Sequence, residues 1–93
     1  MIDTVRLNVG GDDLGLPFVT RPMLDLWVHA LHGGNPFLIV DRADDPLRFV
    51  QTYRNGPGDY TLEYRDGADA EIRSTTIDAP GTVVDLIWEW IAS

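Results

Sequence analysis

Residues Leu47–Thr76 read LRFVQTYRNGPGDYTLEYRDGADAEIRSTT, and this stretch decides the fold. Its three runs of alternating polar and apolar residues are separated by two turn signals, Asn55–Gly58 and Asp66-Gly67. An alternation with a period of two is typical of half-buried strands, and turns rich in glycine and asparagine connect neighbouring strands. The stretch therefore predicts a meander of three antiparallel strands.

The alternation also predicts which side of the meander meets the core. We expect Tyr60, Leu62 and Tyr64 of the middle strand to face inward, because they are the apolar set. The outward set on the three strands is then Arg48, Val50, Thr52 and Arg54, followed by Thr61, Glu63 and Arg65, followed by Glu71, Arg73 and Thr75. Such an outer side of Arg, Glu and Thr is either a solvated sheet face or a binding face.

The segments before the meander supply two strands, a helix and a further strand. Asp3–Val9 alternates as a half-buried strand, and Leu14–Val19 predicts a returning edge strand because Pro17 cannot donate to a ladder. Thr20 caps an amphipathic helix with an apolar face of Met23, Leu24, Trp27, Ala30 and Leu31, which ends at Gly33-Gly34 before Asn35-Pro36. Four consecutive apolar residues, Phe37–Val40, predict a strand buried on both faces.

The last segments complete an α+β domain that spans residues 1–93. Asp41–Pro46 reads as a loop, and Asp78 caps a final helix whose core face includes Ile87 and Trp90. The predicted order is therefore ββαββββα. Both helices carry a single apolar stripe, so we expect both to pack on one face of a mostly antiparallel sheet.

The composition restricts the classes of partner. Fifteen acidic residues face seven basic ones, a formal charge of −8, and every basic residue is an arginine. Such a surface repels nucleic acid and anionic lipid and attracts a basic protein, although solubility alone also explains an acidic composition. The chain has no cysteine, no signal-peptide pattern and no apolar run of membrane-spanning length, so we expect a cytoplasmic protein.

The meander topology gathers acidic residues at one end of the sheet. Successive hairpin turns alternate between the two ends of a sheet, so Asp41–Pro46 and Asp66–Asp69 lie at the same end. We call the five acids of these two loops the acidic rim: Asp41, Asp44, Asp45, Asp66 and Asp69. Whether Asp12 and Asp13 join the rim depends on the position of the first hairpin, which the sequence leaves open.

Catalytic and metal-binding patterns are absent from the sequence. The only serines, Ser74 and Ser93, lack a nucleophile motif, and the glycine turns lack the phosphate-loop pattern and its lysine. His29 and His32 have helical spacing but only Asp25 nearby, fewer ligands than zinc takes. We therefore expect no enzyme activity, no cofactor and no metal.

One tryptophan lies away from the core stripe of the last helix. Trp88 is on the flank of that helix, where it either packs under a loop or anchors an interface. Aromatic residues are enriched at the centres of protein interfaces, so Trp88 is a candidate partner contact or dimer contact.

The chain resembles a family of small bacterial immunity proteins from polymorphic toxin systems, the α+β family often paired with deaminase-type toxins. The resemblance lies in a glycine-turn hairpin, a helix that opens after Thr20-Arg21-Pro22, the run PFLIVDR, the strand LEYRDG and a closing helix. It implies a non-catalytic, cytoplasmic protein that blocks a toxin by binding it directly. An acidic rim suits a toxin whose own site is basic because it handles nucleic acid.

The sequence thus predicts a non-catalytic acidic binding protein, and most concretely an immunity protein with a basic toxin domain as its partner. The alternative is a small-ligand-binding or homo-oligomeric domain. We expect the chain to be a monomer or a homodimer. We also expect it to bind neither nucleic acid nor membrane. The predicted partner-binding residues are the acidic rim together with Arg48, Glu63, Arg65 and Trp88.

Overall fold

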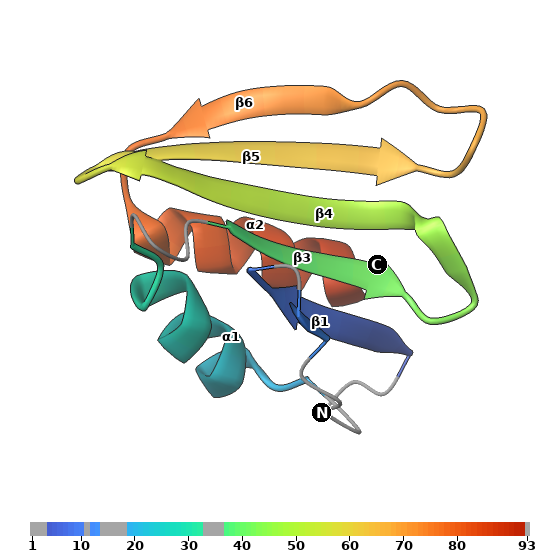
Figure 1. Cartoon of the computed structure of the whole chain (residues 1–93), viewed down its shortest axis with the longest axis horizontal. Coiled ribbons are helices and arrows are strands. Elements are labelled where there is room, and N and C mark those ends of the chain that lie inside the picture. Colours follow the sequence, from blue (N-terminus) through green and yellow to red (C-terminus); the bar gives the residue numbers. More distant parts are fainter. Residues whose placement is uncertain (1–3, 11, 14–18, 33–36, 93) are drawn as a thin grey trace.

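The computed structural model describes residues 4–10, 12–13, 19–32 and 37–92 of the chain (Figure 1). Its elements in chain order are β1 (Val5–Val9), β2 (Asp12–Asp13), α1 (Arg21–His29), β3 (Phe37–Arg42), β4 (Asp45–Gly56), β5 (Asp59–Asp66), β6 (Arg73–Ile77) and α2 (Pro80–Ala92). The predicted α+β class and the order ββαββββα are confirmed. Most of the predicted strand Leu14–Val19, and the predicted helix stop at Gly33–Pro36, lie outside the described residues.

The strands form one antiparallel sheet in the order β2-β1-β3-β4-β5-β6. Its centre is the hairpin of β4 and β5, which turns at Pro57-Gly58, where Gly58 has a positive φ of 67° that favours glycine. The turns β3–β4 and β5–β6 lie together at one end of the sheet, as the meander predicts (Figure 1). Among the described residues, the sheet extends on the far side of β1 only through the two residues of β2.

One face of the sheet carries the core. Leu7 lies opposite Val40, Val40 opposite Val50, and Val50 opposite Tyr64, so one row of inward side chains crosses four strands. A parallel row contains Leu38, Thr52 and Leu62, all three with 0% exposure. The two rows form the floor on which both helices pack. We call this side of the sheet the inner face.

The helices cover the inner face with short apolar side chains. In α1 the Thr20 hydroxyl accepts a hydrogen bond from the Met23 amide and caps the helix, as predicted. Leu24 and Val28 of α1 are fully buried, whereas Ala30, expected in the apolar stripe, is exposed. The buried residues of α2 are Val83, Val84, Ile87 and Ile91.

Two inward-facing arginines hold the ends of the helices. The Arg42 guanidinium donates to the carbonyl oxygens of Ile91 at 3.2 Å and Trp90 at 2.8 Å, and it stacks over the Trp90 ring at 4.3 Å. Arg54 donates to the Leu31 carbonyl, just beyond α1, at 3.1 Å. The last carbonyls of a helix lack partners within the helix, and cations are favoured there. Each arginine therefore satisfies groups that the fold buries beside the sheet.

The predicted faces of two strands are wrong. Val50 and Thr52 of β4 are fully buried on the inner face rather than outward, and Arg54, which lies opposite Tyr60, faces inward with them. Arg73 and Thr75 of β6 lie opposite Tyr64 and Leu62, so they too face the helices. The reason in β4 is that both sides of the strand are partly apolar, so that apolarity alone selected the wrong side.

The strand β3 also differs from its prediction. It is buried on one face only, because Leu38 and Val40 are buried while Phe37 and Ile39 are partly exposed on the other side. The expected loop Asp41–Pro46 is shorter than predicted: β3 continues through Arg42, β4 begins at Asp45, and the turn between them is Ala43-Asp44.

Candidate binding surfaces

The outer face of the sheet, the side that neither helix covers, carries large apolar side chains. Phe37 and Ile39 of β3 lie beside Phe49 and Tyr53 of β4. We call these four residues the apolar band. The first three are partly exposed and Tyr53 is 39% exposed. A group of aromatic and aliphatic side chains on an open sheet face is unusual for a solvated surface and typical of a contact surface.

The strand register arranges the apolar band. Phe37 lies directly opposite Tyr53, and their rings stack with centroids 5.3 Å apart and an interplanar angle of 25°. Ile39 lies opposite Gln51, and Asp41 lies opposite Phe49, so each of these apolar residues faces a polar one across the two strands. Cross-strand aromatic pairs fix ring positions on a sheet face, so the band presents preformed, ordered rings.

Charged and polar pairs flank the apolar band on both sides. On β1, Arg6 makes two hydrogen bonds to the carboxylate of Asp41, at 3.2 and 3.0 Å. On β5, Glu63 accepts a hydrogen bond from the Gln51 amide at 2.8 Å. The charges of Arg6 and Asp41 are paired within the sheet, whereas Glu63 accepts a hydrogen bond from a neutral amide and can still pair with a cation of a partner. An apolar centre with a polar margin is the usual anatomy of a protein interface.

The acidic rim forms at one end of the sheet, but most of its charges are engaged. Asp41 pairs with Arg6, Asp66 pairs with Arg48 at 3.0 Å, and the Asp45 carboxylate accepts a hydrogen bond from the Leu47 amide at 3.1 Å. In the described part of the chain, only Asp44 and Asp69 of the rim are exposed and outside any ion pair or side-chain hydrogen bond. The rim is therefore a weaker source of negative potential than its sequence predicts.

Asp12 and Asp13 do not join the rim. The β1 residue Val9, which pairs with Asp12, also pairs with Leu38 near the start of β3. The rim lies beyond the other end of β3, at the turn Ala43-Asp44. The two aspartates of β2 are thus at the opposite end of the sheet.

The remaining predicted contact residues are divided among three places. Glu63 and Arg65 lie on the outer face, as expected, and Arg65 also donates to the carbonyls of Gly67 and Ala68, which shapes the β5–β6 loop. Arg48 lies opposite Asp66 in the inward-facing register, beside the rim, so its assignment to the outer face is wrong. Trp88 is half-buried against the core on α2, in the helix layer.

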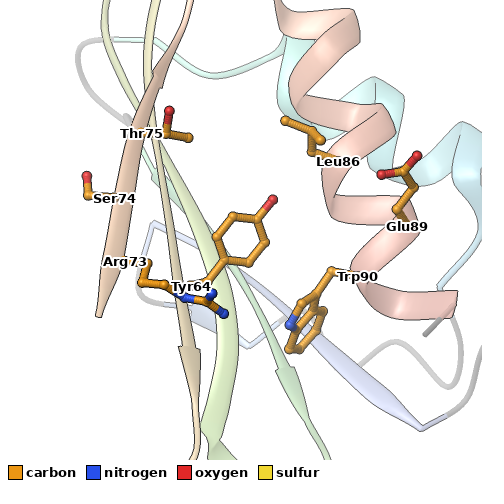
Figure 2. A pocket seen from close by; sticks show the side chains of 7 residues that line it. All are labelled: Tyr64, Arg73, Ser74, Thr75, Leu86, Glu89 and Trp90. Carbon is orange, nitrogen blue, oxygen red and sulfur yellow. The ribbon is translucent and has the colours of Figure 1, made fainter. Parts of the chain in front are cut away.

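A cleft of about 470 Å³ lies between β6 and α2, and the sequence did not reveal it (Figure 2). We call it the β6–α2 cleft. Tyr64 of β5 projects into it from the sheet, and Leu86, Glu89 and Trp90 line it from α2. The β6 wall consists of Arg73, Ser74 and Thr75, all of which are exposed. The cleft lies where the inward side of β6 at Arg73 and Thr75 stays exposed beside α2, whereas Ile77 at the end of β6 packs against the core.

The cleft combines an aromatic floor with two opposite charges. Burial raises the pKa of the Tyr64 hydroxyl above its ordinary 10.0, the Glu89 carboxylate raises it further, and Arg73 lowers it. Glu89 and Arg73 both line the cleft, yet in the described part of the chain neither is in an ion pair. The cleft thus offers a neutral hydroxyl, a carboxylate and a guanidinium to a bound group.

The apolar band was not predicted from the sequence, although the symmetry of the turn between β4 and β5 identifies it. The turn Asn55–Gly58 is followed by Asp59, and a hairpin centred on Pro57 places Arg54 opposite Tyr60 and Val50 opposite Tyr64. Residues that lie opposite each other point to the same face. Since Tyr64 faces the core, Val50 faces it too, and Phe49 and Tyr53 must then face outward. Turn symmetry is here a better guide than the apolarity of one strand.

Comparisons with protein-family models, with curated proteins and with solved structures found no match to this chain. Among the described residues, no three His, Asp or Glu side chains come together as a metal site would require. None of the helices in the described ranges is long and apolar enough to cross a lipid bilayer. A binding role of the apolar band and of the β6–α2 cleft is therefore supported by their geometry and their charges.

Proposed function

We propose that this chain is a non-catalytic binding protein whose partner is a protein with a basic surface. The observation that carries the proposal is the apolar band, which lies on a sheet face that neither helix covers. The net charge of −8 supports the sign of the partner, because complementary charge speeds association and excludes like-charged competitors. A second acidic copy of the same chain is disfavoured by that same charge.

The band provides anchoring groups that such a partner needs. Ordered aromatic side chains contribute most of the binding energy in many interfaces, provided that they lie at the centre and polar pairs exclude water around them. Phe49 and the stacked pair Phe37–Tyr53 occupy that central place, and the pairs Arg6–Asp41 and Gln51–Glu63 surround it. Little rearrangement of the outer face is required before a partner binds.

The biological role that we propose is that of an immunity protein, which neutralises a cognate toxin by direct binding. The support is the resemblance of the chain to that class, its acidic charge and the open sheet face. A toxin that acts on nucleic acid has a basic site, and an acidic protein with an apolar contact surface suits it. The role is tested by coexpression: if a toxin gene lies beside the gene of this chain, cells that express that toxin should grow only when this chain is present.

Small-ligand binding is the second candidate, and the β6–α2 cleft is the observation in its favour. Its volume falls within the usual range of about 300–1,000 Å³ for ligand sites. Ligand sites usually enclose most of the ligand, however, whereas the β6 wall of this cleft is made of exposed residues. The open wall favours a binding site for part of a larger molecule.

Affinity capture from cells of the source organism tests the main proposal when three baits are compared. The wild type and a Leu26→Ser control should retain the same stoichiometric partner, because Leu26 is 66% exposed on α1, in the other layer of the molecule. The double variant Phe49→Ser/Tyr53→Ser should lose it. Circular dichroism confirms that all three baits are folded.

Two results would contradict the proposal. One is full retention of the partner by Phe49→Ser/Tyr53→Ser. The other is the absence of any stoichiometric partner with the wild-type bait. A third result, loss of the partner with Leu26→Ser alone, would place the contact on the helix layer. It would overturn the assignment of the contact to the apolar band.

A further inference from the structure

The strand β6 has an open edge that the fold does not protect. It pairs with β5 on one side, and no other described strand lies along its second side. Its sequence, RSTTI, contains no proline, and its first four residues are exposed. An open edge of this kind presents unpaired amide and carbonyl groups, onto which an extended segment of another protein can add as a further strand.

The β6–α2 cleft reaches this open edge. The Ser74 side chain points away from the cleft, so Ser74 lines it through its main chain, whereas Thr75 points toward α2 (Figure 2). A strand added beside β6 would direct every second side chain toward the helix layer. One such side chain, placed beside Arg73–Thr75, would enter the cleft.

The chemistry of the cleft suits a long side chain with an apolar stem and a polar end. Leu86 and Trp90 are half-buried and offer apolar surface along α2. The Tyr64 hydroxyl projects from the sheet toward α2, and Glu89 lines the same cleft from α2 between Leu86 and Trp90. Arginine and lysine pack their stems on apolar surface and direct the charged end to a carboxylate.

The charges around the edge favour a basic segment. Four exposed carboxylates, none of them in an ion pair within the described residues, lie on the β5–β6 loop, after β6 and on α2: Asp69, Glu71, Asp78 and Glu89. Arg73 is the only basic residue in the described segment 67–92. These four carboxylates border the edge of β6, while the arginines near it are Arg73 on the cleft wall, Arg65, which donates to the β5–β6 loop, and Arg42, which stacks on Trp90.

We propose that β6 accepts an extended basic segment of a partner protein as an additional strand, with one arginine or lysine side chain in the β6–α2 cleft. Main-chain hydrogen bonds to β6 hold the segment, and the cleft selects the side chain through Glu89, Leu86 and Trp90. Arg73 opposes a cation on the same wall, so it limits affinity for a basic residue. This site is separate from the apolar band and does not depend on it.

Nuclear magnetic resonance with ¹⁵N-labelled protein tests the proposal directly. The probe is the peptide acetyl-Thr-Val-Thr-Arg-Thr-Val-Thr-amide, and the control peptide has Glu in place of Arg. The arginine peptide should shift the Trp90 indole N–H and the β6 amides, and it should bind about tenfold more tightly than the glutamate peptide, a difference of about 1.4 kcal/mol. Equal binding of the two peptides, or shifts confined to other strands, would overturn the proposal.

Two variants of the cleft give predictions of opposite sign. Glu89→Gln should weaken binding of the arginine peptide about two- to fivefold, because an exposed charge pair of ordinary strength is lost. Arg73→Gln should tighten it by a similar factor, because a like charge is removed. Both residues are exposed, so neither change threatens the fold. The reverse pattern, or no change in either variant, would contradict a basic side chain in the cleft.

Sedimentation separates a peptide site from self-association. The wild type should sediment as a monomer of 10.4 kDa with the β6 edge free. A stable dimer whose β6 amides are protected from exchange would show that a second copy fills the edge and would overturn the proposal. The apolar-band variant Phe49→Ser/Tyr53→Ser should bind the arginine peptide as the wild type does, so failure of one proposal is distinguishable from failure of the other.

Discussion

The two faces of this sheet differ in what covers their apolar side chains. On the inner face, Val40, Val50 and Thr52 lie under the helices with no exposure, and the Tyr60 ring is buried there too. On the outer face, Phe37 and Phe49 are partly exposed and Tyr53 is 39% exposed. Neither helix covers these outer rings, so a partner would be needed to remove them from water.

The arginines on the two faces differ in the same way. Arg42, on the inner face, satisfies main-chain carbonyls at the end of α2 and is buried. Arg6, on the outer face, is 43% exposed and joins β1 to β3 through the Asp41 carboxylate. The inner arginine stabilises the fold, while the outer one forms part of the surface that a partner would meet.

The largest expected effect comes from truncating an inner residue. Leu62→Ala should lower the free energy of unfolding by about 2–5 kcal/mol, because Leu62 is fully buried and its loss leaves a cavity. The matched outer change, Phe49→Ala, should lower it by about 1 kcal/mol or less. Urea unfolding followed by circular dichroism measures both. Equal losses would mean that the outer face is part of the core.

Replacing Arg42 or Arg6 by methionine tests whether the inner arginine contributes more to the free energy of unfolding than the outer one. Arg42→Met should lower the free energy of unfolding by about 2 kcal/mol, since the Trp90 and Ile91 carbonyls lose charged donors. Arg6→Met should lower it by less than about 1 kcal/mol, because its ion pair is exposed. The same urea titration provides the values, and a larger effect for Arg6 would reverse the roles that we assign.

One inner residue, Thr52, lowers the stability of the fold, and a substitution can restore it. The Thr52 hydroxyl is fully buried, and its oxygen has no hydrogen-bond partner among the described residues, so its burial lacks a compensating hydrogen bond. Thr52→Val should raise the free energy of unfolding by about 1 kcal/mol, whereas Thr61→Val on the outer face should leave it nearly unchanged. Thermal unfolding compares the two variants. Destabilisation by Thr52→Val would show that the hydroxyl has a partner.

The acidic rim should affect rates more than affinities. Reversing its two unengaged charges, in Asp44→Arg/Asp69→Arg, should slow association with the captured partner a few-fold at low salt and flatten its salt dependence. Asp45 is left in place because its carboxylate holds the Leu47 amide. Stopped-flow or surface-based kinetics gives the rates. An unchanged association rate would show that the acidic rim does not speed association with the partner.

The smallest effect concerns alkaline pH. The pKa of Tyr64 is raised in the folded protein, chiefly by burial and then by Glu89, with Arg73 acting in the opposite direction. The folded state therefore holds the Tyr64 proton more tightly than the unfolded state, so this contribution to stability is intact below pH 10.0 and is lost as pH rises through the folded pKa. Tyr64→Phe should make stability less dependent on pH above 10.0. An identical pH profile would contradict the shift.

The sequence predicted the elements better than their faces. Turn signals and alternation were enough for the ββαββββα order, because glycine turns and the period of a strand are local properties. The inward side of β4 was wrong, because LRFVQTYR has apolar residues on both sides and the decision is made by what fits under a helix. Arg54 was expected on the outer face, but it faces inward, where its guanidinium donates to the Leu31 carbonyl. That carbonyl and the α2 carbonyls bound by Arg42 are placed by tertiary packing, which the alternation of one strand does not reveal.

The candidate site was predictable only in outline. Acids at one end of the sheet follow from the meander, and Glu63 and Arg65 follow from the alternation of β5. The engagement of Asp41 by Arg6 depends on β1 lying beside β3, a neighbour that local sequence does not reveal. The cleft depends on how far α2 extends across the sheet, which is a property of packing.

Methyl cross-saturation in the complex with the captured partner tests the central claim most directly. With only the isoleucine methyl groups of this chain protonated, saturation of the partner should reach Ile39 on the outer face and leave Ile87 and Ile91 in the core unaffected. We predict that the Ile39 methyl signal loses the largest fraction of its intensity. Transfer that bypasses Ile39 and appears at Ile91 or Ile87 would place the partner on the helix layer and contradict the account.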